Sequence, residues 1–357
     1  MNPFFPWAAA LLTAGRLLAQ EPPQGTALDH ITTRQEWVAR RAQIVAAMES
    51  VMGPLPTGTA RSPLEPRIEQ EVDCGDHIRR LITYQSEPGG RTPAYLLLPK
   101  TVFAEPPSQL PAVLCLHPTN AQLGNEVIVR AHLPGDYPYA LELVQRGFVV
   151  IAPAYPLMAK YQPNLQALGY ASGTMKAVWD NIRALDYLET LPFVQKGAFG
   201  AIGHSLGGHN ALFTAVFEPR IHVVISSCGF DSFQDYYHGA PRVWQQGSGW
   251  TQERYMPRLA QYAGRLSSIP FDFDGVLAAL APRHVLVSAP VDDLNFRADS
   301  VDRLIAAARP VFTMLGAGEN LDLEHPAGAH GFSAEMRARA YQLLERELPP
   351  QAARQER

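Results

Sequence analysis

Residues 198–208, which read AFGAIGHSLGG, decide the fold. The apolar run from Ala198 to Gly203 predicts a strand, and a helix is expected to follow through Phe217. Between them lies the G-x-S-x-G sequence Gly203-His204-Ser205-Leu206-Gly207, in the strand–turn–helix setting that a nucleophile elbow requires. So tight a turn strains the serine backbone and leaves almost no room for side chains two residues to either side, where glycines stand. The alternative is a Gly-rich turn with a structural serine.

Strands and helices alternate around this turn from Pro111 onward. Short unbroken apolar runs are typical of strands covered on both faces, and apolar residues at helical spacing predict helices. The other expected strands are residues 112–116, 148–152, 223–227, 285–288 and 311–315, and the other expected helices are residues 139–145, 172–191, 298–308 and 334–348. This alternation predicts an α/β fold, with a mostly parallel central sheet and helices on both of its faces.

The chain before Pro111 is organised differently. Residues 1–20 contain an apolar run and no acidic residue, which indicates a signal peptide and a secreted or periplasmic protein. Residues 21–66 are interpreted as a linker and one helix, which begins at a capping box, Thr33-x-x-Glu36, and stops at Gly53-Pro54. The catalytic domain is expected over residues 67–350. It should start with antiparallel strands at residues 68–72, 78–84 and 93–98.

The composition excludes several classes of protein. The 357 residues carry a net charge of −4 and are 46% hydrophobic, a globular composition without the basic field that attracts nucleic acid. Beyond the N-terminal stretch, no run reaches the roughly 18–20 apolar residues of a membrane-spanning helix. Cys74, Cys115 and Cys228 show no C-x-x-C spacing, so neither a disulfide framework nor a zinc site is predicted. Cys115 and Cys228 are interpreted as small buried hydrophobic residues.

A carboxylate must accompany the serine. A serine hydroxyl is a poor nucleophile without a base, and the base needs an orienting acid. In this fold the acid follows the serine in the chain and the histidine follows the acid. Asp293, in the loop after residues 285–288, is the first candidate for the acid, with Asp292 and Asp231 as alternatives.

The base should lie between the last strand and the last helix. His330 stands there, in the small-residue segment Gly328-Ala329-His330-Gly331-Phe332, and is the first candidate. His325 is the alternative. His204 should pack or hydrogen-bond beneath the site, and His209 should occupy a face of the helix after the elbow.

The oxyanion hole needs two backbone N–H donors. Leu206, directly after the nucleophile, should supply one. The second should come from the loop His117-Pro118-Thr119-Asn120, which follows residues 112–116. Because Pro118 has no N–H, Thr119 is the expected donor. The alternative is a turn without a catalytic role.

With these residues placed, the chain resembles the α/β-hydrolases from about Arg67 to Leu348. Within them it is most similar to the bacterial acetylxylan-esterase-like and dienelactone-hydrolase/prolyl-oligopeptidase-like branch. The resemblance rests on four segments: Thr92-Pro93-Ala94-Tyr95-Leu96-Leu97-Leu98-Pro99, Leu116-His117-Pro118-Thr119, Gly203-His204-Ser205-Leu206-Gly207-Gly208 and His330-Gly331-Phe332. Many relatives have His-Gly in place of His117-Pro118. Glucuronoyl esterases carry Cys before and Arg after the nucleophile, the positions of His204 and Leu206 here, so the resemblance favours that activity less.

The resemblance implies hydrolysis of a carboxylic ester through an acyl-enzyme, without a metal or organic cofactor. Ser205 would attack the carbonyl, and His330 would take its proton and return it to the leaving alcohol. Asp293 would orient the imidazole, and the N–H groups of Leu206 and Thr119 would hold the oxyanion. The implied substrate is a small-molecule or carbohydrate ester.

Residues 229–273 interrupt the alternation and hold ten aromatic residues, which predicts a lid insertion above the site. Its aromatics either stack on sugar rings or a phenolic acyl group, or form the insertion's own core; the candidates for stacking are Trp244, Trp250, Tyr236 and Tyr237.

Three functions follow from this sequence. The first is a secreted serine carboxylesterase that removes acyl groups, acetyl groups included, from a plant-type polysaccharide. The second is a serine peptidase of the prolyl-oligopeptidase type, although about 45 residues before the catalytic region are too few for the propeller that gates such peptidases. The third is a catalytically silent binding protein on the same fold, against which the complete set of Ser205, Asp293 and His330 argues.

Overall fold

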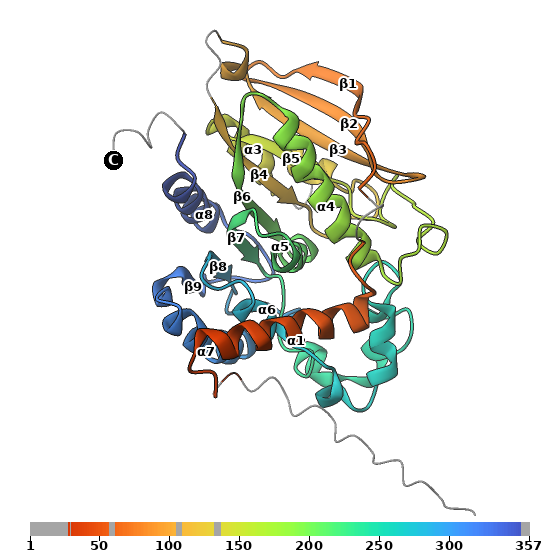
Figure 1. Ribbon diagram of the computed structural model, residues 1–357, viewed down its shortest axis with the longest axis vertical. Helices are drawn as coiled ribbons and strands as arrows, with labels where there is room; N and C mark the ends of the chain where they lie inside the picture. The colour runs from red at the N-terminus through yellow and green to blue at the C-terminus, as the bar shows by residue number, and fades with distance from the viewer. Residues whose placement is uncertain (1–27, 29, 57–60, 105–108, 132–136, 351–357) are drawn as a thin grey trace, which may run out of the picture.

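A computed structural model describes residues 28, 30–56, 61–104, 109–131 and 137–350 of the chain. Its frame is a nine-stranded sheet in the order β1-β2-β3-β5-β4-β6-β7-β8-β9, with helices packed against it (Figure 1). The expected signal peptide, residues 1–20, lies outside the described residues.

The strands confirm the predicted mixture of directions. β1 (Arg67–Asp73), β2 (His77–Glu87) and β3 (Gly90–Pro99) are antiparallel neighbours, and β3 pairs antiparallel with β5 (Val149–Pro153). All remaining pairings are parallel; they join β5, β4 (Leu110–Leu116), β6 (Val194–His204), β7 (Ile221–Ser227), β8 (His284–Ser288) and β9 (Leu321–Glu324). The carboxyl ends of the parallel strands therefore meet at one edge of the sheet, where ligands bind in open α/β sheets.

Two hydrophobic clusters cover the two faces of the sheet. One includes side chains of α1 (Arg34–Met52), α4 (Gly173–Thr190), α5 (Leu206–Phe217), α6 (Phe273–Ala278) and α7 (Ala298–Met314). The other includes side chains of α2 (Glu126–Val129), α3 (Tyr139–Gln145) and α8 (Ala334–Glu347). Along β4 the residues alternate between them: Ala112 and Leu114 join the first cluster, and Val113 and Cys115 the second. Burial on both faces explains why these strands are unbroken apolar runs.

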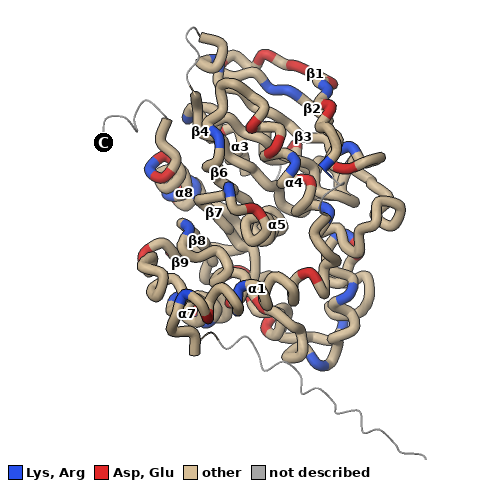
Figure 2. Tube along the Cα trace, viewed as in Figure 1, with Lys and Arg blue, Asp and Glu red and all other residues tan. Residues whose placement is uncertain are grey.

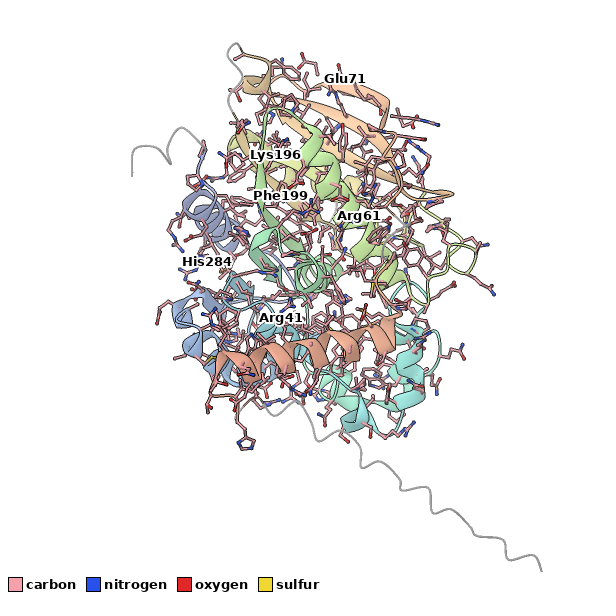
Figure 3. The ribbon with its side chains drawn as sticks, viewed as in Figure 1. Arg41, Arg61, Glu71, Lys196, Phe199 and His284 are labelled. Carbon is pink, nitrogen blue, oxygen red and sulfur yellow. The ribbon has the colours of Figure 1, made fainter. Side chains whose placement is uncertain are left out.

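The N-terminal helix α1 is docked against α5 and α6. It begins at the predicted capping box, in which Thr33 accepts from the Glu36 N–H and Glu36 accepts from the Thr33 N–H. The Arg41 side chain, labelled in Figure 3, donates to the Val216 carbonyl at 2.8 Å and the Ala279 carbonyl at 3.0 Å. α1 thus packs against the C-terminal ends of α5 and α6.

One strand prediction is wrong. Residues 311–315 were expected to form a strand, but α7 continues through Met314 and the last strand is β9. The buried residues of α7 keep helical spacing beyond Pro310; they are Ser300, Val301, Leu304, Ile305, Ala308, Val311 and Phe312. The apolar run at residues 311–315 is therefore the end of a helical stripe, and the proline within the helix hid this periodicity.

A buried ionic group, which the sequence did not predict, joins α4 to β2. The Lys176 ammonium contacts the Asp180 carboxylate one turn along the helix and the Glu87 carboxylate at 3.1 Å. Asp180 also accepts from the hydroxyls of Thr92 at 2.6 Å and Tyr161 at 2.9 Å. Lys176 and Asp180 are fully buried. Every charge in this group has a partner of opposite sign, as burial demands.

Figure 2 shows acidic and basic residues interspersed along the described chain. Within the same residues, no helix is both long enough and apolar enough to cross a membrane.

Candidate active site

The elbow at Ser205 has the geometry that its sequence predicts. Ser205 lies between β6 and α5 with φ 54° and ψ −120°, and its N–H donates to the Ser227 carbonyl at 2.8 Å. A Cβ added to Gly203 would lie 2.2 Å from backbone atoms of Gly207, and one added to Gly207 would lie 1.9 Å from the Leu116 carbonyl oxygen. Both glycines are therefore required by space.

Three candidate residues, far apart in the sequence, meet at the carboxyl edge of the sheet. His330 Nε2 lies 2.9 Å from Ser205 Oγ, and His330 Nδ1 lies 2.8 Å from Asp293 Oδ2. Ser205 follows β6, Asp293 follows β8 and His330 follows β9. This line of two hydrogen bonds can pass a proton from the hydroxyl to the imidazole.

The second oxygen of Asp293 fixes the carboxylate. Asp293 Oδ1 accepts from the N–H groups of Asn295 at 2.7 Å and Phe296 at 3.2 Å. Burial by itself would raise the pKa of Asp293, but the hydrogen bond and charge of His330 and these two N–H donors outweigh it and hold the pKa below its usual value. Asp293 is therefore a carboxylate when it faces the imidazole.

The alternative acids lie elsewhere. Asp292 is exposed beside Asp293, so its carboxylate is solvated. Asp231 is buried and accepts from the Arg297 N–H at 3.3 Å. Burial raises the pKa of Asp231 to about 8, with smaller contributions from the carboxylates of Asp235 and Asp272. At neutral pH Asp231 is thus largely protonated.

The other histidines have separate roles. His325 lies 2.7 Å from the Ala289 carbonyl and 3.1 Å from Asp302. His204 is buried beneath the site, where its Nδ1 lies 3.1 Å from Ser227 Oγ and its ring centre 5.0 Å from that of His330. Burial lowers the pKa of His204 to about 3, so it packs under His330 as a neutral ring.

His209 has an aromatic environment on α5. Its buried ring lies edge-on to Phe213 and Trp250, with centres 4.2 and 4.8 Å apart. Burial lowers the pKa of His209 to about 3. The helix that begins directly after Ser205 is thereby packed against the aromatic insertion.

Both expected oxyanion donors border Ser205. The Leu206 N–H stands at the start of α5, where a helix offers it no internal acceptor. Thr119 lines the same pocket as Ser205. Its hydroxyl lies 3.0 Å from the Tyr255 hydroxyl.

His117 orients the loop that carries Thr119. His117 Nε2 accepts from the Tyr155 N–H at 3.0 Å, so the ring proton is on Nδ1, which donates to the Pro118 carbonyl at 2.8 Å. Burial lowers the pKa of His117 to about 4, so this neutral tautomer persists. Within the planar Pro118–Thr119 peptide the N–H is opposite the carbonyl. The bond from His117 thus turns the Thr119 N–H away from the imidazole.

The insertion after β7 is built from short 3-10 turns: η3 (Tyr236–Gly239), η4 (Pro241–Trp244), η5 (Gly249–Thr251), η6 (Pro257–Tyr262) and η7 (Leu266–Ser268). Of the four aromatics predicted to contact substrate, Trp250 and Tyr236 line the pocket that contains Ser205. Trp244 is buried against Phe233 instead, and Tyr237 is 39% exposed and packs on Tyr236.

The pocket at Ser205 has a volume of about 70 Å³. Besides the predicted residues, its walls contain Tyr255, Asn295 and Phe296, which the sequence analysis did not single out. Tyr255 belongs to the aromatic excess of the insertion, so the composition held a signal for it. Asn295 and Phe296 follow Asp293 by two and three residues, and no motif marks them.

Comparison with known proteins identifies the relatives of this chain. A family model described as "Glucuronyl esterase, fungi" matches residues 165–316. A Bacillus subtilis protein named "Putative hydrolase YtaP" is 26% identical over an alignment of 280 positions, which covers 72% of this chain and 84% of YtaP. A 4-O-methyl-glucuronoyl methylesterase of Schizophyllum commune is 23% identical over an alignment of 326 positions, which covers 84% of this chain and 74% of that protein.

The solved structures agree on the fold. A glucuronoyl esterase from Solibacter usitatus matches with a TM-score of 0.69 and 19% identity, over 92% of this chain and 98% of that one. An acetyl xylan esterase-like structure from Bacteroides fragilis matches with a TM-score of 0.56 and 16% identity, over 82% of this chain and 75% of that one. The similarity thus extends to the glucuronoyl esterases, the branch that His204 and Leu206 disfavour in the sequence. The chain thus has the α/β-hydrolase fold, and the glucuronoyl methylesterases that it resembles in sequence are carboxylic-ester hydrolases.

Proposed function

We propose that the protein hydrolyses carboxylic esters of carbohydrates through an acyl-enzyme on Ser205. The observation that carries this proposal is the hydrogen-bonded line from Ser205 Oγ through His330 to Asp293, with distances of 2.9 and 2.8 Å. His330 Nε2 takes the hydroxyl proton as Ser205 attacks the carbonyl carbon, and then gives this proton to the leaving alcohol. A water molecule, activated by the same nitrogen, releases the acid and restores Ser205.

The proposed oxyanion hole consists of the N–H groups of Leu206 and Thr119. Both residues border the pocket with Ser205, and the His117 bond to the Pro118 carbonyl favours the required orientation of the Thr119 N–H. In such a site, one preorganised donor contributes about 3–4 kcal/mol to transition-state stabilisation. Asp293 keeps the Nδ1 proton of His330 in place and stabilises the imidazolium that forms.

Esters of uronic acids are the first candidate substrates. This assignment is supported by the glucuronyl esterase family match over residues 165–316 and by the names of the glucuronoyl methylesterase relatives. In such a substrate the sugar carries the acyl carbon, and the ester carboxyl is uncharged. Among the described residues, those that line the pocket offer hydroxyl, amide and aromatic groups and no ionisable acid or base other than tyrosine, which suits an uncharged ester.

Acetyl esters of a polysaccharide are the second candidate. A pocket of about 70 Å³ is well below the roughly 300 Å³ at which ordinary ligand pockets begin, so an acetyl group fits it more readily than a whole sugar ring. Leu206 also stands where glucuronoyl esterases carry arginine.

A substrate panel distinguishes these candidates. The purified protein and Ser205→Ala are each assayed with methyl glucuronate, acetylated xylooligosaccharide, p-nitrophenyl acetate and a dipeptide amide. We expect ester turnover that falls about a million-fold in Ser205→Ala and negligible amide turnover. The ratio of kcat/KM for the two carbohydrate esters assigns the acyl group. Near-normal activity of Ser205→Ala on every ester would overturn the proposal.

We also propose that the protein is exported after cleavage near residue 20, with residues 67–350 as the catalytic domain and residues 229–273 as its lid. The sequence of residues 1–20 supports export. N-terminal sequencing of protein recovered from the periplasm or medium tests it: an intact Met1 on the recovered protein would contradict the assignment.

A further inference from the structure

A cysteine lies beside the two residues of the proposed proton relay. The sulfur of Cys228, a carboxylate oxygen of Asp293 and a ring nitrogen of His330 all lie within 4.8 Å of one another. Cys228 directly follows β7, Asp293 follows β8 and His330 follows β9, so three adjacent parallel strands deliver three side chains of different chemistry to one point.

The backbone holds the thiol firmly in this place. The Cys228 N–H donates to the Ser288 carbonyl at 2.8 Å, and the thiol donates to the Gly331 carbonyl at 3.4 Å. Cys228 has φ 48°, in the left-handed region that non-glycine residues rarely adopt. Cys228 is buried, as its sequence predicts, but burial of a small side chain does not by itself account for the left-handed backbone or for the thiol contact.

We propose that Cys228, Asp293 and His330 bind a soft divalent cation, Cd²⁺ or Zn²⁺, and that the bound ion inhibits the esterase. Thiolate, imidazole and carboxylate are the protein ligands of zinc, and three of them with one open position form a familiar coordination set. Thiolate gives the site its preference for soft ions. The inhibition rests on the proposed function, whereas the binding does not.

The exchange of protons explains why the ion would inhibit. The ion takes the thiol proton's place on Cys228, and one proton leaves to solvent. The ion also takes the lone pair of His330 Nδ1, the nitrogen turned to Asp293, so the single proton of the neutral ring moves to Nε2. Nε2 then carries a hydrogen toward Ser205 Oγ and cannot accept one from it. The serine loses its base while the pocket stays open.

The dimensions allow the site to close around an ion. With zinc bond lengths of about 2.0–2.3 Å, the ligand atoms of a tetrahedral site lie about 3.3–3.8 Å apart. The present atoms are within 4.8 Å, so small side-chain movements bring them together. Cys228 itself is buried, but the segment before His330 consists of Ala327, Gly328 and Ala329, all exposed. An ion can reach the sulfur through movement of this small-residue loop.

The test uses the full chain with its other two cysteines replaced, C74S/C115S, in which Cys228 is the remaining thiol of three. Titration with CdCl₂ is followed by near-ultraviolet cadmium–thiolate absorption and, in parallel, by turnover of p-nitrophenyl acetate. We expect one equivalent of Cd²⁺ to produce the absorption, and inhibition to follow the same curve. In C74S/C115S/C228S the absorption should vanish and the inhibitory concentration should rise at least tenfold.

Each outcome has a definite meaning. If C74S/C115S/C228S is inhibited at the same cadmium concentration, or if C74S/C115S shows no cadmium–thiolate absorption, the proposal is overturned. Circular dichroism establishes that each variant is folded, and C74S/C115S/C228A repeats the comparison if the serine variant is not. Because the absorption needs no catalysis, it should appear even in C74S/C115S/S205A. Failure of the proposed esterase mechanism therefore remains distinguishable from failure of the metal site.

Discussion

The exchange of Asp293 for asparagine tests the proton relay, because the structure determines how the new amide must sit. Asp293 Oδ1 accepts from two backbone N–H groups, those of Asn295 and Phe296, and these donors need an oxygen in the variant as well. The amide oxygen therefore takes the Oδ1 position and the NH₂ group faces His330 Nδ1. A donor there cannot pair with Nδ1–H, so the ring keeps its proton on Nε2 and presents a hydrogen to Ser205.

The expected loss follows from this wrong tautomer. In a Ser–His–Asp relay such a change lowers turnover by about 10⁴, which corresponds to about 5.4 kcal/mol of transition-state stabilisation. Asparagine has the shape of aspartate and keeps both backbone bonds, so the melting temperature should change little. The assay is kcat/KM for p-nitrophenyl acetate, with the melting temperature measured on the same samples.

Asp292→Asn is the matched control, because it makes the same chemical change at the exposed neighbouring residue. We expect its activity to remain within about twofold of the parent protein. If Asp293→Asn is folded and retains more than a tenth of the activity, Asp293 does not orient His330 for proton transfer. If Asp292→Asn is the crippled variant, the acid is the other member of the pair.

Three further predictions concern the scaffold. Lys176→Met should lower the free energy of unfolding by about 3–5 kcal/mol in urea, because it leaves Asp180 buried without its cation. The folded-state pKa of Asp231 is raised to about 8, so its contribution to the free energy of unfolding is present below about pH 4 and is lost as the pH rises toward 8. In Asp231→Asn, the free energy of unfolding should therefore fall less over this pH range, by a few kcal/mol, when it is measured as a function of pH. Trp244→Ala should lower the melting temperature but leave kcat/KM on p-nitrophenyl acetate unchanged, whereas Trp250→Ala should lower both. The reason is that, of these two residues, only Trp250 borders the pocket with Ser205. Equal losses of activity in the two variants would contradict this prediction.

The features that the sequence predicts are those with local causes. The elbow needs glycine at 203 and 207 for reasons of space alone, and the unbroken apolar runs follow from a sheet covered on both faces. Chain order and the loops that carry them indicate Asp293 and His330, and these two residues lie within hydrogen-bond distance of each other. None of these inferences required knowledge of a long-range contact.

The features that the sequence does not predict depend on partners far away in the chain. Lys176 lies in a helix whose sequence has the usual amphipathic spacing. Nothing in that spacing indicates that Glu87 on β2 is its partner. The orienting role of His117 depends on the Tyr155 N–H, 38 residues later. The sequence pattern does not predict that the helix continues through Pro310, because proline usually ends a helix. Tertiary packing of Val311 and Phe312 overrides that preference here.

The residues of the proposed chemistry follow from local sequence, whereas the choice of substrate depends on contacts between distant segments. The proposed chemistry depends on the elbow and on strand ends, which the sheet fixes. Half of the residues that line the pocket come from the insertion, and that insertion is packed against α5 through His209 and Trp250. Leu206 borders the pocket at the position where the resemblance leads one to expect arginine in a glucuronoyl esterase, while the fold stays similar to theirs. Substrate choice can therefore differ from that of the relatives without any change in Ser205, Asp293 or His330, and for this reason the ratio of turnover on the two carbohydrate esters is the measurement that assigns it.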